Sequence, residues 1–526
     1  MDVSSRTITP SQTNSGAYKW LILGNIMIGT FMAVLDTTIV NTGLPVIMGT
    51  LGASINTAEW VLTGYMLAIA SILPAAAWLA DRFGYKRIYF LSLLVFTFGS
   101  FMCGNSTSIE ELIFWRVIEG FGCGAIMPLG MAIVSNTFTP EERGMALGFW
   151  TIASAASVSF GPYIGGYLVD NLNWNYIFYV NVPVGIFAMF VTAVLQKEYK
   201  AATASPFDIP GFVTSGIFLP LFMYGLSEVN SATNTQGWNS PVVLACMWIS
   251  AVVFVLFIYF ELTVKHPLIN LKVFKDRNFS LSNLMIFIFG IGMFGSTFLI
   301  PLYLQNNLGY SALQAGAVFI PVGIIQGICS PVAGILGQKI NPKILIVTGL
   351  ILMGMSFYMN FYLSLLTEEW YLMLSLCIRG IGMGILFTPL LTLSLANIRI
   401  DMMAQASSAT NIIRQMGGSF GVAIFSHILT QRTNYHSQRY NEALNYTGEI
   451  YRQTIDNLSD FTRQTTGASE ATAKSLAEQM IIKRMDLEAY IGGINDDFFI
   501  AFVITLICIL PIFWIHQSNK SKMKLK

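Results

Sequence analysis

Two charged residues three positions apart in an apolar stretch are the first candidates for chemistry. Arg116 and Glu119 lie in an apolar run from Glu111 to about Asn136, which is long enough to cross a bilayer. A charge near the middle of a bilayer costs about 3 kcal/mol or more, so such residues usually mark a site. Residues three apart leave the same helix face, so both side chains enter one polar cavity. The alternative is an ion pair that only packs two helices.

Asp36 is a second acid in an apolar run. It lies 16 residues after Trp20, and Glu119 lies 17 residues before Asn136. At the rise of an α-helix both acids are about 25 Å from the same membrane side, so they are expected at similar depth. We predict that no other acid lies well inside a membrane-spanning helix.

The three residues together suit the exchange of protons. Removal from water favours the neutral form of a carboxyl group, and a nearby arginine favours its charged form. Asp36 and Glu119, with Arg116 beside them, could therefore take up and release protons as their cavity opens to alternate sides. The alternative for Asp36 is a neutral carboxyl group hydrogen-bonded to Thr37 or Asn41.

The composition places these residues in a membrane protein. Of the 526 residues 54% are hydrophobic and 11% charged, which is too apolar for a soluble domain. Apolar stretches of bilayer length predict an all-α integral membrane protein with fourteen spanning helices. They are expected at about residues 20–47, 58–80, 88–104, 111–136, 144–169, 176–196, 209–227, 241–262, 280–304, 312–337, 343–365, 370–396, 404–430 and 497–516.

Lysine and arginine indicate the orientation. Of these 29 residues, 19 lie in segments assigned to the cytoplasm, three in the membrane and seven in the long segment 431–496. Short outer loops have none, as the positive-inside rule requires, and long loops largely escape that rule. We expect both termini in the cytoplasm and segment 431–496 outside the membrane.

An internal repeat indicates two similar halves. Glu119–Gly124 is matched by Arg379–Gly384, and Ser159–Gly161 by Ser419–Gly421, both at an offset of 260 residues. Repeats of this kind place substrate and ion sites near the bilayer midplane. The expected units are an N-terminal tail (1–19), a six-helix bundle (20–196), linkers with two inserted helices (197–279), a second six-helix bundle with the outer segment (280–516) and a tail (517–526).

Two further arginines lie in predicted helices of the second half. Arg379 occupies the position that matches Glu119, and Arg414 lies ten residues into the thirteenth helix. Either could contact the substrate or act as a charge partner. The alternatives are an arginine capped by backbone carbonyls for Arg379, and a tie to loop carbonyls for Arg414.

The loop between the second and third helices combines acid and base. Asp81, Arg82, Gly84, Lys86 and Arg87 lie within seven residues, and Gly84 permits a tight reversal. Asp81 could pair with an arginine or a helix N-terminus in one conformation and release it in another. We interpret this loop as a conformational switch.

Four segments resemble the major facilitator superfamily, in particular its fourteen-helix drug:proton antiporter branch. They are the loop at Asp81, with Ala77 where glycine is usual; the stretch Leu35–Pro45, with Gly43 where alanine is common; Gly148 to Gly166 in the fifth helix, with Ser157 replacing a glycine; and Asn173–Pro183. Glu119 stands where the branch usually has glutamine.

The resemblance implies a multidrug efflux pump of the inner membrane that exchanges amphipathic compounds for protons. Gly161, Pro162, Gly165 and Gly166 make a kinked helix with a small face, suited to packing on the other half. The resemblance implies that this contact holds the outward end closed and favours export. The alternative is uptake of a small polar solute.

Segment 431–496 has the patterning of two helices, at about 441–465 and 469–490. A helical hairpin standing above the membrane would fit. Within the family such a loop resembles pumps that dock a periplasmic adaptor protein, which implies an outer-membrane channel as well. The alternative is a solvated cap without a partner.

Other chemistries have little support in the sequence. No glycine-rich phosphate loop ending in Gly-Lys-Ser/Thr and no metal-ligand spacing occurs, so we expect neither a cofactor nor a metal, and a proton gradient as the energy source. The six cysteines are scattered through predicted helices. No nucleophile–base cluster indicates an enzyme, and nucleic acid is not an expected partner.

Overall fold

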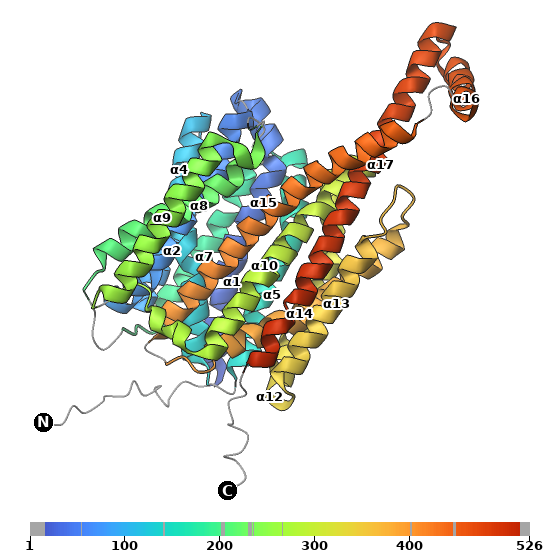
Figure 1. The fold of residues 1–526 in the computed structure, drawn as a ribbon. Coiled ribbons are helices and arrows are strands. Elements are labelled where there is room, and N and C mark those ends of the chain that lie inside the picture. Colours follow the sequence, from blue (N-terminus) through green and yellow to red (C-terminus); the bar gives the residue numbers. More distant parts are fainter. Residues whose placement is uncertain are drawn as a thin grey trace, which may run out of the picture.

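The structure is a computed structural model that describes residues 16–53, 55–139, 142–200, 206–229, 234, 236–265, 267–399, 402–444 and 449–515. These residues form helices and connecting loops, without a strand among them. Figure 1 shows long, roughly parallel helices with one arm that projects beyond the rest.

The helices follow the predicted order. The first half contains α1 (Gly16–Leu51), α2 (Ile55–Phe83), α3 (Tyr85–Gly104), α4 (Ile109–Thr137), α5 (Arg143–Asn171), α6 (Tyr176–Tyr179) and α7 (Asn181–Leu195). Next come α8 (Ile209–Glu228), η1 (Gly237–Asn239), α9 (Pro241–Thr263) and η2 (Leu271–Lys275). The second half contains α10 (Arg277–Leu302), η3 (Tyr303–Asn307), α11 (Ala312–Ala317), α12 (Phe319–Lys339), α13 (Pro342–Asn360), α14 (Glu369–Leu395), α15 (Met403–Ala443), α16 (Glu449–Thr466), α17 (Glu470–Ile507) and η5 (Leu510–Trp514).

Twelve stretches of the described chain are long and apolar enough to cross a membrane. The remaining long helices, α5 and α15, pack among them, α5 against α1 and α12, and α15 against α10 and α17. Both are rich in small or polar residues, which suit close packing against neighbouring helices better than contact with lipid. The fold class is therefore the predicted all-α membrane bundle.

Helices α8 and α9 lie at the edge of the bundle, as Figure 1 shows in green. They pack against each other, and α8 also packs on α2. Large apolar side chains of α9 remain exposed, such as Trp248 at 71% and Val255 at 65%. An apolar helix with so little protein cover is one that faces lipid.

The repeated glycines of α4 and α14 make equivalent contacts in the two halves. An added Cβ at Gly122 would meet Phe96 of α3, and one at Gly382 would meet Gly349 of α13. Likewise Gly120 faces α2 and Gly380 faces α12. The repeat in the sequence is thus a repeat of helix packing.

The two halves meet at one end through a shared apolar core. We call this the basic end, because the loop between α2 and α3 and the segment 197–199 lie there. The core joins residues of the first half with Leu391, Leu395, Met403 and Ala406 of α14 and α15. A hydrogen bond of 2.7 Å from Ser408 Oγ to Leu73 O also links α15 to α2.

The projecting arm is built from extensions of two membrane helices. Helix α15 runs without a break from Met403 to Ala443, and α17 runs from Glu470 to Ile507. Helix α16 packs on α17, where Thr462 Oγ1 donates to Ala473 O at 3.2 Å. The arm stands clear of the bundle in Figure 1, at what we call the arm end.

Candidate functional site

Asp36, Arg116 and Glu119 form one buried cluster, which we call the buried triad. Arg116 Nη1 donates to Asp36 Oδ2 at 2.6 Å and to Glu119 Oε2 at 2.8 Å. All three side chains are 0% exposed. Asp36 comes from α1, and the other two come from one face of α4. The structure therefore joins the three residues that the sequence predicted at similar depth.

Helix α2 holds the guanidinium of Arg116 in place. Arg116 Nε donates to Val61 O at 3.2 Å, and Cζ lies 3.8 Å from the centroid of the Tyr65 ring. A desolvated cation over an aromatic face gains about 2 kcal/mol. Arg116 is thus fixed from two sides and is not a mobile charge in this conformation.

Polar side chains of α3 and α7 complete the site. Asn181 Nδ2 donates to the second carboxylate oxygen of Asp36 at 3.1 Å, and Cys103 Sγ lies 3.5 Å from Glu119 Oε2. The sequence reasoning did not select Asn181 or Cys103. Asn181 begins α7 in a segment that matched the family, and that match was the available signal.

The charges of the buried triad do not cancel when both acids are ionised. One arginine against two carboxylates leaves a net charge of −1 in a site without water contact. One bound proton makes the site neutral, and a buried neutral site is far less costly than a buried net charge. Glu119 Oε1 and Arg116 Nη2 also lack a hydrogen-bond partner among the described residues.

The alternative expected for Asp36, a hydrogen bond to Thr37 or Asn41, is wrong. Thr37 Oγ1 donates instead to Val34 O at 2.7 Å, and Asn41 is exposed. Asp36 is bound by Arg116 and Asn181.

Arg379 is buried in the second half without a counterpart of the buried triad. It is 2% exposed, and its Nε and Nη1 have no hydrogen-bond partner among the described residues. Its Cζ lies 5.7 Å from the ring centroid of Phe319 on α12.

Arg414 lies between the two halves. Its Nη2 reaches Met127 Sδ of α4 at 3.7 Å and Asn411 Oδ1 of its own helix at 3.2 Å. The neighbouring Gln415 reaches Met66 Sδ of α2 at 3.8 Å. In this conformation Arg414 contacts the other half and not the loop carbonyls that were its alternative partners.

The loop between α2 and α3 is held by the segment after α7. Glu198 accepts from Lys86 N at 3.1 Å and lies 3.6 Å from Arg87 Nε. Gly84 has a φ of 106°, and an added Cβ would overlap the Glu198 carboxylate, so glycine is required there on two grounds.

The remaining polar groups of this loop point in different directions. Asp81 Oδ1 accepts from Tyr85 Oη at 2.9 Å, whereas Arg82 is exposed. Lys86 Nζ donates to Ala193 O of α7 at 2.6 Å, which ties the loop to the first half in this conformation.

The small residues of α5 face two different neighbours. Added Cβ atoms at Gly161 and Gly165 would overlap Thr38 and Thr42 of α1, in the same half. Pro162 and Gly166 instead contact α11 of the second half, at Gly316 and Leu313. Towards the basic end, Gly144 and Gly148 contact α12. Helix α5 thus joins the halves while two of its glycines support the helix that carries Asp36.

One prediction about buried acids is wrong. Asp497 is 0% exposed and lies well inside α17, so Asp36 and Glu119 are not alone. The apolar run appeared to begin at residue 497, which placed this acid at a helix end. The helix in fact starts at Glu470, and the buried spacing of Ile494, Asp497 and Ala501 was the signal that would have revealed it.

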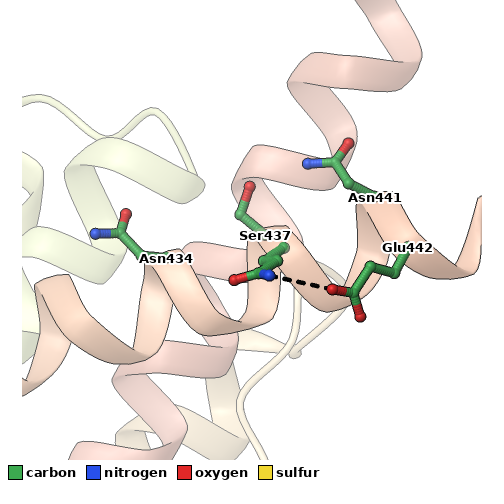
Figure 2. Close-up of a pocket in the computed structure, with 5 residues that line it drawn as sticks. Asn434, Ser437, Asn441 and Glu442 are labelled. Atoms are coloured by element: carbon green, nitrogen blue, oxygen red, sulfur yellow. Dashed lines mark hydrogen bonds between the residues drawn. The ribbon is translucent and has the colours of Figure 1, made fainter.

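A surface hollow lies on the arm and is unrelated to the buried triad. Figure 2 shows Asn434, Ser437, Asn441 and Glu442 along α15, with Gln438 Nε2 donating to Glu442 Oε1 at 3.1 Å. Polar side chains along one face of an exposed helix are typical of solvated surface.

The fold and the buried charges define a class of protein, the multi-pass membrane transporters. Residues 26–422 match the Major Facilitator Superfamily, and the chain belongs to that family. It is a transporter and not an enzyme, and the resemblance found in the sequence is confirmed.

Relatives within the family have names that describe drug export, transport or fatty acid resistance. The chain is 31% identical over 506 residues to the multidrug export protein EmrB of Haemophilus influenzae, covering 95% of this chain and 96% of the relative. It is 30% identical over 505 residues to the uncharacterized MFS-type transporter YhcA of Bacillus subtilis, covering 95% and 93%. It is 29% identical over 514 residues to the fatty acid resistance protein FarB of Neisseria gonorrhoeae, covering 95% and 96%.

Solved structures agree in fold. The human organic anion transporter MFSD10 matches with a TM-score of 0.55 at 12% identity, covering 93% of this chain and 99% of that one. A bacterial homolog of the human lysosomal transporter Spinster matches with a TM-score of 0.54 at 15% identity, covering 96% and 100%.

Proposed function

We propose that this chain exports amphipathic drugs or toxic organic compounds in exchange for protons by alternating access. The observation that carries the proposal is the buried triad, in which one arginine is bound by two carboxylates without water contact. The names of the relatives at about 30% identity support the drug substrates.

The charge balance supplies the coupling. With one proton on Asp36 or Glu119 the site is neutral and can be sealed as it is here. Loss of that proton leaves a net negative charge, which is tolerated only when water reaches the site. Proton release is therefore tied to opening, and Arg116 keeps both acids ready to exchange by stabilising whichever is ionised.

The moving parts would be the two bundles, residues 20–196 and 280–516, which rock about their interface. Helix α5 provides a pivot, because Pro162 and Gly166 contact α11 of the second half. Its Gly161 and Gly165 contact α1 of the first half. Asp81, Arg82, Gly84, Lys86 and Arg87 would act as the switch at the basic end, as the loop exchanges its partners between conformations.

Arg379 and Arg414 would serve the substrate or act as charge partners. Arg379 is buried with two unpartnered nitrogens, and Arg414 lies at the contact between the halves. A guanidinium in such a place can pair with an acidic or polar group that enters during transport.

The distribution of lysine and arginine supports both termini in the cytoplasm, and the likeness to multidrug export proteins supports an inner-membrane location. The basic end would then face the cytoplasm and the arm end the outside. The arm would offer a surface to a periplasmic adaptor protein, which would lead to an outer-membrane channel. Its exposed apolar side chains, such as Phe461 at 56% and Ile482 at 56%, support that role.

Inverted membrane vesicles test the proposal. We expect vesicles with an acidic interior to accumulate dyes, detergents or fatty acids from a screening panel, and Asp36→Asn and Glu119→Gln to abolish this accumulation. Glu110→Gln is the matched control, because Glu110 is an exposed acid on the same helix as Glu119. Normal accumulation by both triad variants would refute the proton site, and accumulation only in alkaline vesicles would indicate uptake.

A further inference from the structure

Asp497 of α17 is a buried acid that does not belong to the buried triad. Its side chain is fully buried, and neither carboxylate oxygen has a hydrogen-bond partner among the described residues. An ionised carboxylate needs donors or a cation, and without them its burial costs several kcal/mol. The protonated form carries a donor of its own and no charge, so this is the form that the site accommodates.

The next residue connects Asp497 with the outside of the bundle. Asp496 Oδ2 accepts from Arg432 Nε at 2.6 Å and lies 2.7 Å from His436 Nε2. The three side chains are between 23% and 39% exposed, so water reaches them. This cluster joins α15 to α17 at the base of the arm, one residue from the buried acid.

The helices around Asp497 offer little to stabilise its charge. The titratable groups that face this region are Arg432 and His436 from α15 and Tyr490 and Asp496 from α17 itself. Both of these α15 side chains are already bound to Asp496. Asn306 of η3 reaches Tyr490 Oη at 3.3 Å.

The other helices packed on α17 bring no cation to this level. Within their described residues α10 and α13 have basic side chains only at the basic end, at Arg277 and Lys343. Arg379 of α14 is a buried cation of this half, and among the described residues no hydrogen bond or ion pair joins it to Asp497. Among the described residues, both carboxylate oxygens of Asp497 and the Nε and Nη1 atoms of Arg379 thus lack a hydrogen-bond partner in this conformation.

We propose that Asp497 is a second proton-binding carboxyl group, placed in the second half and filled from the arm end past Asp496. A proton from the outer solution adds to one carboxylate oxygen of Asp497, with no other bond made or broken. A shift within the second half that brings α17 closer to Arg379 of α14 would favour the ionised form and release the proton toward the basic end. The inference rests on the proposed function and adds a second site, so that two protons are exchanged for each exported molecule.

Infrared spectroscopy of the whole protein in lipid nanodiscs tests for the bound proton directly. A protonated carboxyl group has a C=O band distinct from that of a carboxylate. We expect Asp497→Asn to lose one such band near neutral pH, and Asp497→Glu to shift it. Asp496→Asn, the exposed neighbour, should retain the band. An unchanged spectrum in Asp497→Asn would overturn the proposal.

The proton count in reconstituted vesicles separates this inference from the proposed function. The reversal potential of dye export measures protons exchanged per molecule. We expect two for the unmodified protein and one for Asp497→Asn. A ratio that Asp497→Asn leaves unchanged would refute the second site alone. If the unmodified protein exports without any proton flux, the proposed function itself fails.

Discussion

Replacement of Arg116 by glutamine should destabilise the protein in a manner that depends on pH. The change removes the cation that both carboxylates share at 2.6 and 2.8 Å. Asp36 and Glu119 can then remain buried only if both are protonated, whereas the unmodified triad needs one proton. The variant must therefore bind one more proton when it folds.

The magnitude follows from that extra proton. At about pH 7, a proton held on a carboxyl group whose pKa in water is about 4 costs about 4 kcal/mol. The unfolded chain does not bind this extra proton above about pH 5. The free energy of unfolding of the variant therefore falls by about 1.4 kcal/mol more than that of the unmodified protein for each unit of rising pH. For a chain of this length the unfolding temperature should drop by roughly 4 °C near neutral pH.

Thermal unfolding of the purified protein in detergent, measured across pH, is the assay. The double variant Arg116→Gln/Glu119→Gln leaves one acid and one proton, so it should recover most of the lost stability. If Arg116→Gln unfolds at the same temperature as the unmodified protein at every pH, or if Glu119→Gln brings no recovery, the charge reasoning is refuted.

Three other substitutions test the supports of the site. Gly84→Ala puts a side chain at φ 106° and should cost about 1–2 kcal/mol of stability, while Gly24→Ala, with open space around it, should cost little; equal costs would contradict this account. Gly161→Ala overlaps Thr38 and should cost about 1–3 kcal/mol and reduce export, with partial rescue by Thr38→Ala; no loss in unfolding or export assays would argue against that contact. Asn181→Ala removes the amide donor to the buried triad and should slow dye export in vesicles, and an unchanged rate would show that the donor has no role.

The order of helices could be predicted because each apolar run must match the bilayer thickness. The runs at about 58–80 and 370–396 correspond to α2 and α14 within a few residues. The ends of α15 and α17 could not be predicted in this way. Both helices continue past the membrane as polar helices, where hydropathy no longer marks them.

The candidate site was predictable where a charge interrupts an apolar run. Arg116 and Glu119 stand out by this rule, and Asp36 does so by its depth. Asn181 is uncharged and Asp497 lies at the edge of an apolar run, so neither stands out, although both are buried in the structure. Which residues an arginine contacts depends on helix packing, so the position of Arg379 beside the Phe319 ring could not be predicted.

Proton release on substrate binding tests the central claim most directly. A dye that the vesicles accumulate is added to purified transporter in weakly buffered solution, and the pH change is converted to protons per transporter. We predict a release that is abolished in the double variant Asp36→Asn/Glu119→Gln and retained in Glu110→Gln. Equal release from the double variant and the unmodified protein would show that the buried triad does not carry the exchanged proton.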